Sequence, residues 1–392
     1  MPASNNKLEI FVICAPGLEA VTGAEMLRIG VKPTKVEAGG ISCTGSIQDV
    51  MRLNLWLRTA SRVVVRVAAF HASTFHELER RATKIEWKRH TDGKSPVGFR
   101  VTCKKSKLYH SDAVAERFSK ALTAQVKGAR AERSDEVDED EAMHGDSQQF
   151  IVRLFRDEVT VSIDSSGDLL HRRGYRLATA KAPIRETLAA GMLLAAEWSG
   201  SKTLLDPLCG SGTLPIEAAM LARNIAPGKT RQFAFMNWPG FERRGWQLIL
   251  ADAEKRILPK SPSRILASDR DEGGVTATWE NAKRAGVAGD LDVSRKSMSE
   301  AIADAGSSPG SGLLITNPPY GKRVGEGADP RDLYASLGKA ARERLPGWDV
   351  VLVSNEARLI SQLKLPVELL FSASNGGIPV QAVKGLVPTP GA

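Results

Sequence analysis

Residues 182–392 repeat one pattern, in which short apolar runs suited to buried strands are mostly followed by helical stretches. The expected strands cover residues 203–206, 264–269, 313–317, 349–354, 367–371 and 380–384. Strands that alternate with helices form a doubly wound α/β fold around a mostly parallel sheet. Such sheets bind ligands beyond the carboxyl ends of their strands, near the point where strand order reverses. The residues that carry chemistry in this half are therefore expected at strand ends.

A glycine-rich turn follows the first of these strands. The run is Leu204-Leu205-Asp206-Pro207-Leu208-Cys209-Gly210-Ser211-Gly212-Thr213, and the helical stretch 214–219 comes next. Gly210 and Gly212 let the backbone approach a ligand closely, and the first N–H groups of the helix are available donors. The run is not a full dinucleotide fingerprint, because Pro215 replaces its third glycine, and it lacks the Gly-Lys-Ser/Thr of a P-loop. Asp206 suits a cationic ligand better than a pyrophosphate, which favours a nucleoside-type cofactor site; a structural turn is the alternative.

Two acids, Asp269 and Asp271, stand at the end of the next strand. A carboxylate in such a position accepts hydrogen bonds from both hydroxyls of a ribose. The alternative is that Asp269 caps the helix predicted over 274–285. The spacing from Asp206 favours the ribose role for Asp269 and leaves capping or support to Asp271.

The most specific motif is Asn317-Pro318-Pro319-Tyr320-Gly321, at the end of the strand predicted over 313–317. The two prolines force an extended or turned backbone and supply no N–H group. The carbonyls of Asn317 and Pro318 and the Asn317 side chain can therefore face a ligand as acceptors. Tyr320 offers a ring on which a planar base can stack. Together these residues predict a holder for an exocyclic amino group on a base.

These three motifs resemble the class I S-adenosylmethionine-dependent N-methyltransferases, in which this proline motif marks methylation of an amino nitrogen. Three flanking runs narrow the resemblance: His171-Arg172-Arg173-Gly174-Tyr175-Arg176, Ala182-Pro183-Ile184-Arg185-Glu186-Thr187-Leu188 and Asn281-Ala282-Lys283-Arg284-Ala285-Gly286-Val287. With them the chain is similar to the THUMP-domain RNA guanine-N2 methyltransferases of the bacterial 23S ribosomal RNA type. The resemblance covers essentially the whole chain and is most specific over residues 171–323.

The resemblance implies a cofactor, S-adenosyl-L-methionine, and no metal. The cofactor-binding residues that it implies are Asp206, Pro207, Cys209, Gly210, Ser211, Gly212, Thr213, Asp269, Arg270, Ser297, Met298 and Asn317. The implied catalytic residues are Asn317, Pro318, Pro319 and Tyr320, of which Asn317 and Pro318 grip the target amino group. One position departs from the family pattern: many class I enzymes have an acid where Ser297 and Met298 stand here. A hydroxyl, backbone groups and apolar packing are therefore expected to hold the adenine.

Positive charge is concentrated in the first third of the chain. Residues 1–130 contain 22 Lys+Arg against 11 Asp+Glu, whereas the whole chain has a net charge of +9. Residues 131–146 have one Arg against eight acids, which predicts a solvated acidic loop. The bias predicts a polyanionic partner for the amino-terminal part, with a merely soluble basic surface as the alternative. The resemblance makes the partner RNA, and the expected contacts are Lys104, Lys105, Lys107, Arg172, Arg173 and Arg176.

The expected domains are a ferredoxin-like domain over 1–65, a THUMP RNA-binding domain over 66–165, a linker over 166–181 and the methyltransferase domain over 182–392. The first two are predicted to be α/β, with strands at 8–14, 41–45, 63–67, 98–103, 150–154 and 159–164. Helices are predicted from 16 to about 29, over 46–57 and over 74–87, and one more is capped by Ser111 or Asp112.

The function predicted from these features is methyl transfer to the exocyclic N2 of a guanosine in structured RNA, 23S ribosomal RNA in the first place. The alternatives are a guanosine in transfer RNA, the N6 of adenine in DNA, and a non-catalytic RNA-binding factor with a dead cofactor site. No apolar run approaches the ~18–20 residues that span a bilayer. Four scattered cysteines, Cys14, Cys43, Cys103 and Cys209, fit a reducing compartment. A cytoplasmic monomer without an obligate protein partner is expected.

Overall fold

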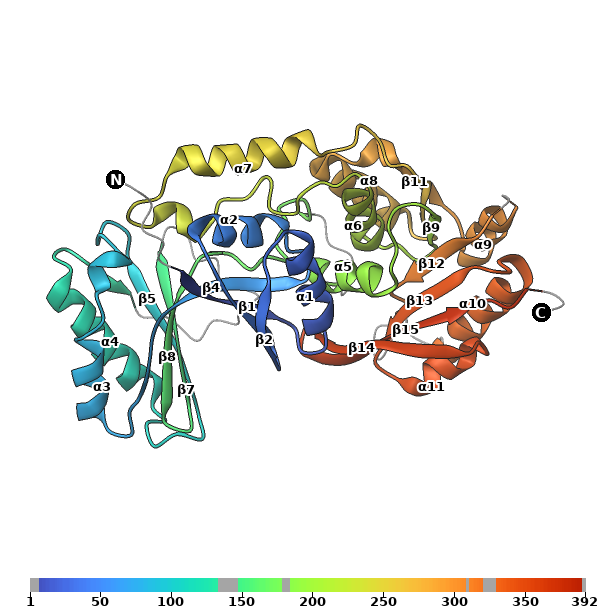
Figure 1. Ribbon diagram of the computed structural model, residues 1–392. Helices are drawn as coiled ribbons and strands as arrows, with labels where there is room; N and C mark the ends of the chain where they lie inside the picture. The colour runs from blue at the N-terminus through green and yellow to red at the C-terminus, as the bar shows by residue number, and fades with distance from the viewer. Residues whose placement is uncertain (1–6, 133–146, 178–183, 308–309, 320–328, 390–392) are drawn as a thin grey trace. The chain divides into compact units, whose positions relative to one another are not determined.

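The computed structural model describes residues 7–132, 147–177, 184–307, 310–319 and 329–389 (Figure 1). The chain divides into two compact units. The first unit comprises residues 1–14, 25–170 and 231–250, and the second comprises 15–24, 171–230 and 251–392. The acidic stretch after Glu132 and the predicted base-stacking Tyr320 lie outside the described residues.

The first unit contains an eight-stranded sheet. Its strands are β1 (Leu8–Cys14), β2 (Pro33–Glu37), β3 (Gly40–Gly45), β4 (Ala60–His71), β5 (Val97–Lys104), β6 (Ala131–Glu132), β7 (Gln148–Phe155) and β8 (Glu158–Asp164), in the order β2-β3-β1-β4-β8-β7-β5-β6. The hairpin predicted from the two apolar runs after residue 149 is confirmed, because β7 and β8 pair antiparallel. The strands β2 and β6 were not among the predicted ones.

Helices of the first unit pack on the sheet by their apolar faces. They are α2 (Ile47–Trp56), α3 (Phe75–Ala82) and α4 (Ser111–Gln125), together with a 3₁₀ turn at Trp87–Arg89, while α1 (Glu19–Arg28) begins in residues of the second unit. Ser46 caps α2 in a capping box with Asp49. The cap predicted for the fourth helix is wrong: His110 is the N-cap of α4, without a side-chain hydrogen bond, and Ser111 is already helical.

Four aromatic side chains form the core beneath α4. Trp87, Phe99, Phe118 and Phe150 are each at most 1 % exposed. Their ring centroids lie 5.2–6.2 Å apart in edge-on and stacked pairs, which are the arrangements that aromatic quadrupoles favour. This cluster joins α4, β5 and β7 into one packed layer.

The limit expected at residue 65 falls inside β4, which pairs with β1 on one side and β8 on the other. The ferredoxin-like strands and those expected for the THUMP region therefore share one continuous sheet. A buried ion pair between Arg62 on β4 and Asp164 at the end of β8 links the two parts. The expected division into a ferredoxin-like domain over 1–65 and a THUMP domain over 66–165 stays a prediction, because the sheet has no break at this limit.

The second unit contains a seven-stranded sheet in the order β11-β10-β9-β12-β13-β15-β14. Its strands are β9 (Thr203–Asp206), β10 (Ile265–Asp269), β11 (Leu291–Arg295), β12 (Gly312–Thr316), β13 (Asp349–Ser354), β14 (Val367–Asn375) and β15 (Ile378–Leu386). The first five are parallel to one another, and β15 runs antiparallel to both β13 and β14. The predicted doubly wound α/β fold is confirmed, and β11 is a strand that was absent from the six predicted ones.

Helices cover the second sheet on both sides (Figure 1). They are α5 (Glu186–Ala195), α6 (Thr213–Ala222), α8 (Glu272–Ala285), α9 (Met298–Gly306), α10 (Pro330–Arg344) and α11 (Ala357–Ile360), and α7 (Arg243–Lys255) runs from one unit into the other. Short 3₁₀ turns stand at Ala234–Asn237, Ala288–Asp290 and Ser361–Leu363. Every residue of β12 is buried, as expected for a central strand packed on both faces.

None of the helices in the described ranges is long and apolar enough to cross a membrane. All four cysteines are free thiols, and Cys103 alone among them is not fully buried.

The aromatic core of the first unit gives a stability test. Phe118→Ala should lower the local stability of this unit by about 3–5 kcal/mol, because it deletes a fully buried ring and leaves a cavity. Hydrogen exchange of the β5 and β7 amides measures that loss. Phe75→Ala, which removes a half-buried ring on α3, serves as the control. Equal effects of the two substitutions would contradict the assignment of Phe118 to the core.

Candidate functional site

Strand order in the second sheet reverses beside β9. From β9 the chain continues to β10 and β11 on one side, and to β12 and β13 on the other. Asp206 ends β9, Asp269 ends β10, and Asn317 follows the last residue of β12. Because these strands are parallel, the three predicted residues lie at one edge of the sheet, at its switch point.

Asp206 is a buried carboxyl, only 1 % exposed. Its Oδ1 accepts a hydrogen bond from the Leu208 N–H at 3.2 Å. Burial raises the pKa of Asp206 to about 7, although the Thr316 hydroxyl and the Leu208 N–H act in the opposite direction. The few hydrogen bonds to this carboxyl do not offset the cost of burying its charge. A bound cation would stabilise the ionised form, so the position suits a cationic group.

The glycine-rich turn has the backbone conformation that its two glycines predict. Gly210 and Gly212 have φ values of +53° and +83°, and Gly212 is the N-cap of α6. A Cβ on Gly212 would lie 2.7 Å from the Thr278 side chain on α8, so a larger residue does not fit. Pro207, Ser211 and Thr213 are buried within the same turn.

Cys209 is a neutral thiol in this environment. Burial raises its pKa, with a smaller contribution from the Asp206 carboxylate. Its Sγ lies 3.5 Å from the Thr278 hydroxyl. Its part in the turn is therefore packing rather than nucleophilic chemistry.

Helix α8 holds the turn by two hydrogen bonds that the sequence did not indicate. The Thr278 hydroxyl donates to the Gly210 carbonyl at 2.8 Å, and Asn281 Nδ2 donates to the Ser211 carbonyl at 2.9 Å. Both side chains are fully buried. Two polar residues three positions apart on the buried face of a helix were the available signal, because such groups need partners inside the protein.

Asp269 binds the same turn from the other side. Its Oδ2 accepts from the Gly210 N–H at 2.9 Å, and its Oδ1 accepts from the Asp271 N–H at 3.0 Å. The carboxylate is half-buried and keeps further lone pairs for a ligand. Asp271 is the N-cap of α8 and accepts from the Gly274 N–H, so Asp269 is not the cap. Arg270 is exposed.

Asn317 presents an acceptor that nothing in the described chain satisfies. Its Oδ1 is buried and has no hydrogen-bond partner among the described residues. Ser268 Oγ, next to the end of β10, is also buried without a hydrogen-bond partner among the described residues. Pro318 is buried and Pro319 is half-buried. Buried polar atoms without partners are rare, and their presence at a strand-order switch point fits a site completed by a ligand.

Ser297 and Met298 follow β11 at the same sheet edge, but the structure gives both of them other contacts. Ser297 is the N-cap of α9, and its hydroxyl donates to the Glu300 carboxylate at 2.7 Å and accepts from the Glu300 N–H. Met298 is 8 % exposed and belongs to the hydrophobic core of the unit. A role for either in holding an adenine stays a prediction.

Two of the three arginines predicted to bind RNA are engaged inside the second unit, which corrects that prediction. Arg173 has a side chain that is 2 % exposed, and its Nε donates to Glu217 on α6 at 3.3 Å. Arg176 is 16 % exposed and pairs with Glu186 on α5 at 3.2 Å. Burying a guanidinium requires a charged partner, so these residues fasten the 171–176 segment to the helices instead of facing a ligand. Arg172 is half-buried.

The same segment reaches the glycine-rich turn through α8. Tyr175 donates its hydroxyl to Glu217 at 3.1 Å, and its carbonyl accepts from Arg284 Nε at 2.8 Å. Arg284 in turn donates to Asn281, which holds the Ser211 carbonyl. Burial and the surrounding arginines lower the pKa of His171 to about 3, so this histidine is uncharged.

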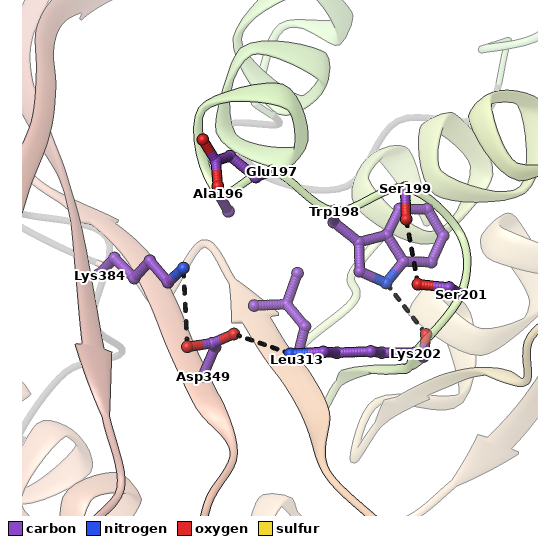
Figure 2. Close-up of a pocket in the computed structure, with 9 residues that line it drawn as sticks. All are labelled: Ala196, Glu197, Trp198, Ser199, Ser201, Lys202, Leu313, Asp349 and Lys384. Carbon is purple, nitrogen blue, oxygen red and sulfur yellow. Dashed lines mark hydrogen bonds and ion pairs between the residues drawn. The ribbon is translucent and has the colours of Figure 1, made fainter.

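Lys104, Lys105 and Lys107, the remaining predicted RNA contacts, are exposed in the first unit. A separate hollow of the second unit lies at the opposite, amino-terminal edge of its sheet (Figure 2). Asp349 at the start of β13 stands there between Lys202, at 3.7 Å, and Lys384, at 3.6 Å. This hollow contains none of the predicted cofactor residues. The described ranges hold no cluster of three or more His, Cys, Asp or Glu side chains that would suit a metal ion.

Comparison with known proteins agrees with this site. Residues 173–382 match the family model described as the RMKL-like methyltransferase domain, and residues 9–64 match the RlmL ferredoxin-like domain. A ribosomal RNA large subunit methyltransferase K/L of Syntrophotalea carbinolica is 34% identical over 95% of this chain and 52% of that protein. The chain thus spans about half the length of the K/L enzymes it matches.

Two further proteins match over nearly their full length. A putative RNA methyltransferase of Synechocystis is 32% identical over 95% of both chains. The crystal structure of SMU.472, a putative methyltransferase complexed with SAH, is 27% identical and superimposes with a TM-score of 0.83 over 97% of this chain and 98% of that one. Fold, switch-point residues and both family matches lead to one assignment. The chain belongs to the RMKL-like methyltransferase family, and its cofactor is S-adenosylmethionine.

Proposed function

We propose that the chain transfers a methyl group from S-adenosylmethionine to the exocyclic N2 of a guanosine in structured RNA, with 23S ribosomal RNA as the first candidate. The observation that carries this proposal is the buried Oδ1 of Asn317 at the switch point, which has no hydrogen-bond partner among the described residues. The name of the K/L relative, which refers to large-subunit ribosomal RNA, supports the choice of substrate. Such an RNA substrate also fits the cytoplasmic location expected from the sequence.

The residues present fit the cofactor. The Asp206 carboxyl at the end of β9 suits the ammonium group of its methionine part, and the open lone pairs of Asp269 suit its ribose hydroxyls. Gly212 lets the turn between them pack closely against α8, because a Cβ there would lie 2.7 Å from the Thr278 side chain. The bound cofactor supplies an electrophilic methyl group on a sulfonium centre.

The task left to the protein is to orient a weak nucleophile. The lone pair of guanine N2 is delocalised into the ring and is poorly available. Asn317 Oδ1 and the Pro318 carbonyl would accept the two hydrogens of that amino group and direct its lone pair toward the methyl group. The proton can leave to solvent after transfer, so no strong base is needed. A base within a helix cannot reach this edge, so the target must be unpaired or flipped out.

The acceptor role of Asn317 is testable by substitution. Asn317→Ala should lower the rate of methyl transfer to ribosomal RNA by at least about 10²-fold, because one of two positioning acceptors is lost. Its affinity for S-adenosylhomocysteine should stay within about twofold of the original, since the residue acts on the other substrate. Single-turnover transfer and calorimetry measure the two quantities. Asn237→Ala, at an exposed asparagine, is the control, and near-normal transfer by Asn317→Ala would refute the mechanism.

The raised pKa of Asp206 predicts how cofactor binding depends on pH. A cation binds the ionised carboxyl, so below a pKa of about 7 binding must first release a proton. The affinity for S-adenosylhomocysteine should therefore fall as pH is lowered from 7 to 5.5, by up to roughly tenfold per pH unit. Asp206→Asn should bind more weakly at pH 7 and lose this dependence. Calorimetry across the range tests both points, and an equal slope in the variant would show that another group titrates.

A further inference from the structure

Two loops meet at one end of the sheet in the first unit. The loop after β5 contains Lys105 and Lys107, and the two-residue turn between β7 and β8 consists of Arg156 and Asp157. The Lys107 N–H donates to Asp157 Oδ1 at 2.7 Å, and the Arg156 N–H donates to the Lys104 carbonyl at 3.3 Å. These contacts hold the two loops side by side as one surface.

One exposed aromatic ring of this surface lies next to guanidinium groups, and a second ring follows the lysine loop in the sequence. Phe155, the last residue of β7, is 37% exposed, and Tyr109 is 69% exposed. The guanidinium carbons of Arg153 and Arg156 lie 5.7 and 5.2 Å from the centroid of the Phe155 ring. The Tyr109 ring lies 4.1 Å from the His110 ring. Both guanidinium groups lie over the Phe155 ring as cation–π partners, which orients the ring, and 37% of the residue stays exposed.

The charge of this surface is not compensated within the described chain. Lys104, Lys105, Lys107, Arg153 and Arg156 form no ion pair with any described residue. The nearby Asp157 carboxylate is engaged by the Lys107 backbone. A second acid, Glu158, lies opposite Phe155 in the hairpin and is exposed. Five cations without an ion-pair partner among the described residues outnumber these two acids, which favours a polyanion.

Three residues of this surface have a left-handed backbone conformation. Lys105, Arg156 and Asp157 have φ values of +53°, +53° and +64°. They are three of the six non-glycine residues with positive φ in the described chain. Glycine or asparagine would be more stable at the lysine and arginine positions, so the cations are kept at a conformational cost.

We propose that this strand-end surface, made by Lys104, Lys105, Lys107, Tyr109, Arg153, Phe155 and Arg156, binds a single-stranded segment of RNA. Unpaired bases stack on Phe155 and Tyr109, and the five cations contact the phosphates. Paired bases keep their faces stacked inside the helix, so a duplex would meet the cations but not the rings. The inference rests on the proposed function for its choice of nucleic acid, and it assigns the site and the mode of binding.

The test measures how the chain of residues 1–392 binds a fluorescent, mixed-sequence RNA of about 16 nucleotides, as a single strand and annealed to its complement. Phe155→Ala and Tyr109→Ala should each weaken single-strand binding about 5- to 100-fold and change duplex binding little. Phe155→Trp should retain or improve binding, because it preserves the stacking face. Phe75→Ala is the matched control. It removes a half-buried ring of α3 that lies beneath Arg117 of α4.

The cations are tested by the dependence of binding on salt. The double substitution of Arg153 and Arg156 by Ala should reduce the slope of log K against log salt by roughly 1.4, the value for two contacts on a single strand. Arg80→Ala with Arg81→Ala removes the same charge from exposed positions on α3 and should leave the slope unchanged.

Methyl transfer by the original protein to total ribosomal RNA separates this inference from the proposed function. If transfer occurs but the ring variants bind single strands normally, or lose single-strand and duplex binding equally, the surface is overturned and the function stands. If the rings matter for binding but no RNA is methylated, the surface stands and the proposed function fails. Normal binding of RNA by all variants, with loss only of binding to an acidic protein, would show that the surface serves a protein partner.

Discussion

The site depends on hydrogen bonds that fix the carbonyls and the N–H of one short turn. Thr278 and Asn281 on α8 hold the Gly210 and Ser211 carbonyls, while Asp269 accepts from the Gly210 N–H. A loop with two glycines has many accessible conformations, and ordering it costs conformational entropy. Buried side-chain donors offset that cost, because releasing the carbonyls would leave both partners unsatisfied. The conformation of the glycine-rich turn is therefore set by α8 as much as by the sequence of the turn.

This arrangement also explains why Arg173 and Tyr175 of the basic 171–176 segment are buried. Arg173 and Tyr175 meet at Glu217 on α6, the helix that starts at the turn, and the Tyr175 carbonyl reaches Asn281 through Arg284. The segment thus supports both helices that shape the site. Removing one partner of such a buried charge network leaves an uncompensated charge, which is strongly destabilising. Arg173 and Arg176 therefore act on the geometry of the site through α6 and α5.

The sequence predicted the architecture of the second unit well, because its signals are local. Asp206, Gly210, Gly212 and the paired prolines each follow a strand, and the parallel sheet brings strand ends together without further information. The capping role of Asp271 was predicted by the same local logic.

Long-range partners were less predictable. Arg173 was predicted to face RNA because it stands in a basic run. Its true partner, Glu217, lies 44 residues away, and charge patterning does not reveal such a pair. Thr278 and Asn281 were missed for the same reason, since their acceptors are carbonyls in a distant turn. The continuity of the first sheet through β4 was hidden as well, because strand pairing between β4 and β8 spans about a hundred residues.

The central claim is that the acceptors at Asn317 and Pro318 select the exocyclic amino group of a guanine. Its most direct test is to incubate the protein with S-adenosylmethionine and either ribosomal RNA, transfer RNA or DNA, and to identify the methylated nucleoside by mass spectrometry after digestion. We expect N2-methylguanosine, formed in ribosomal RNA in preference to transfer RNA and DNA. Methylation of adenine N6 in DNA, or of a ring nitrogen or a ribose oxygen in RNA, would contradict it.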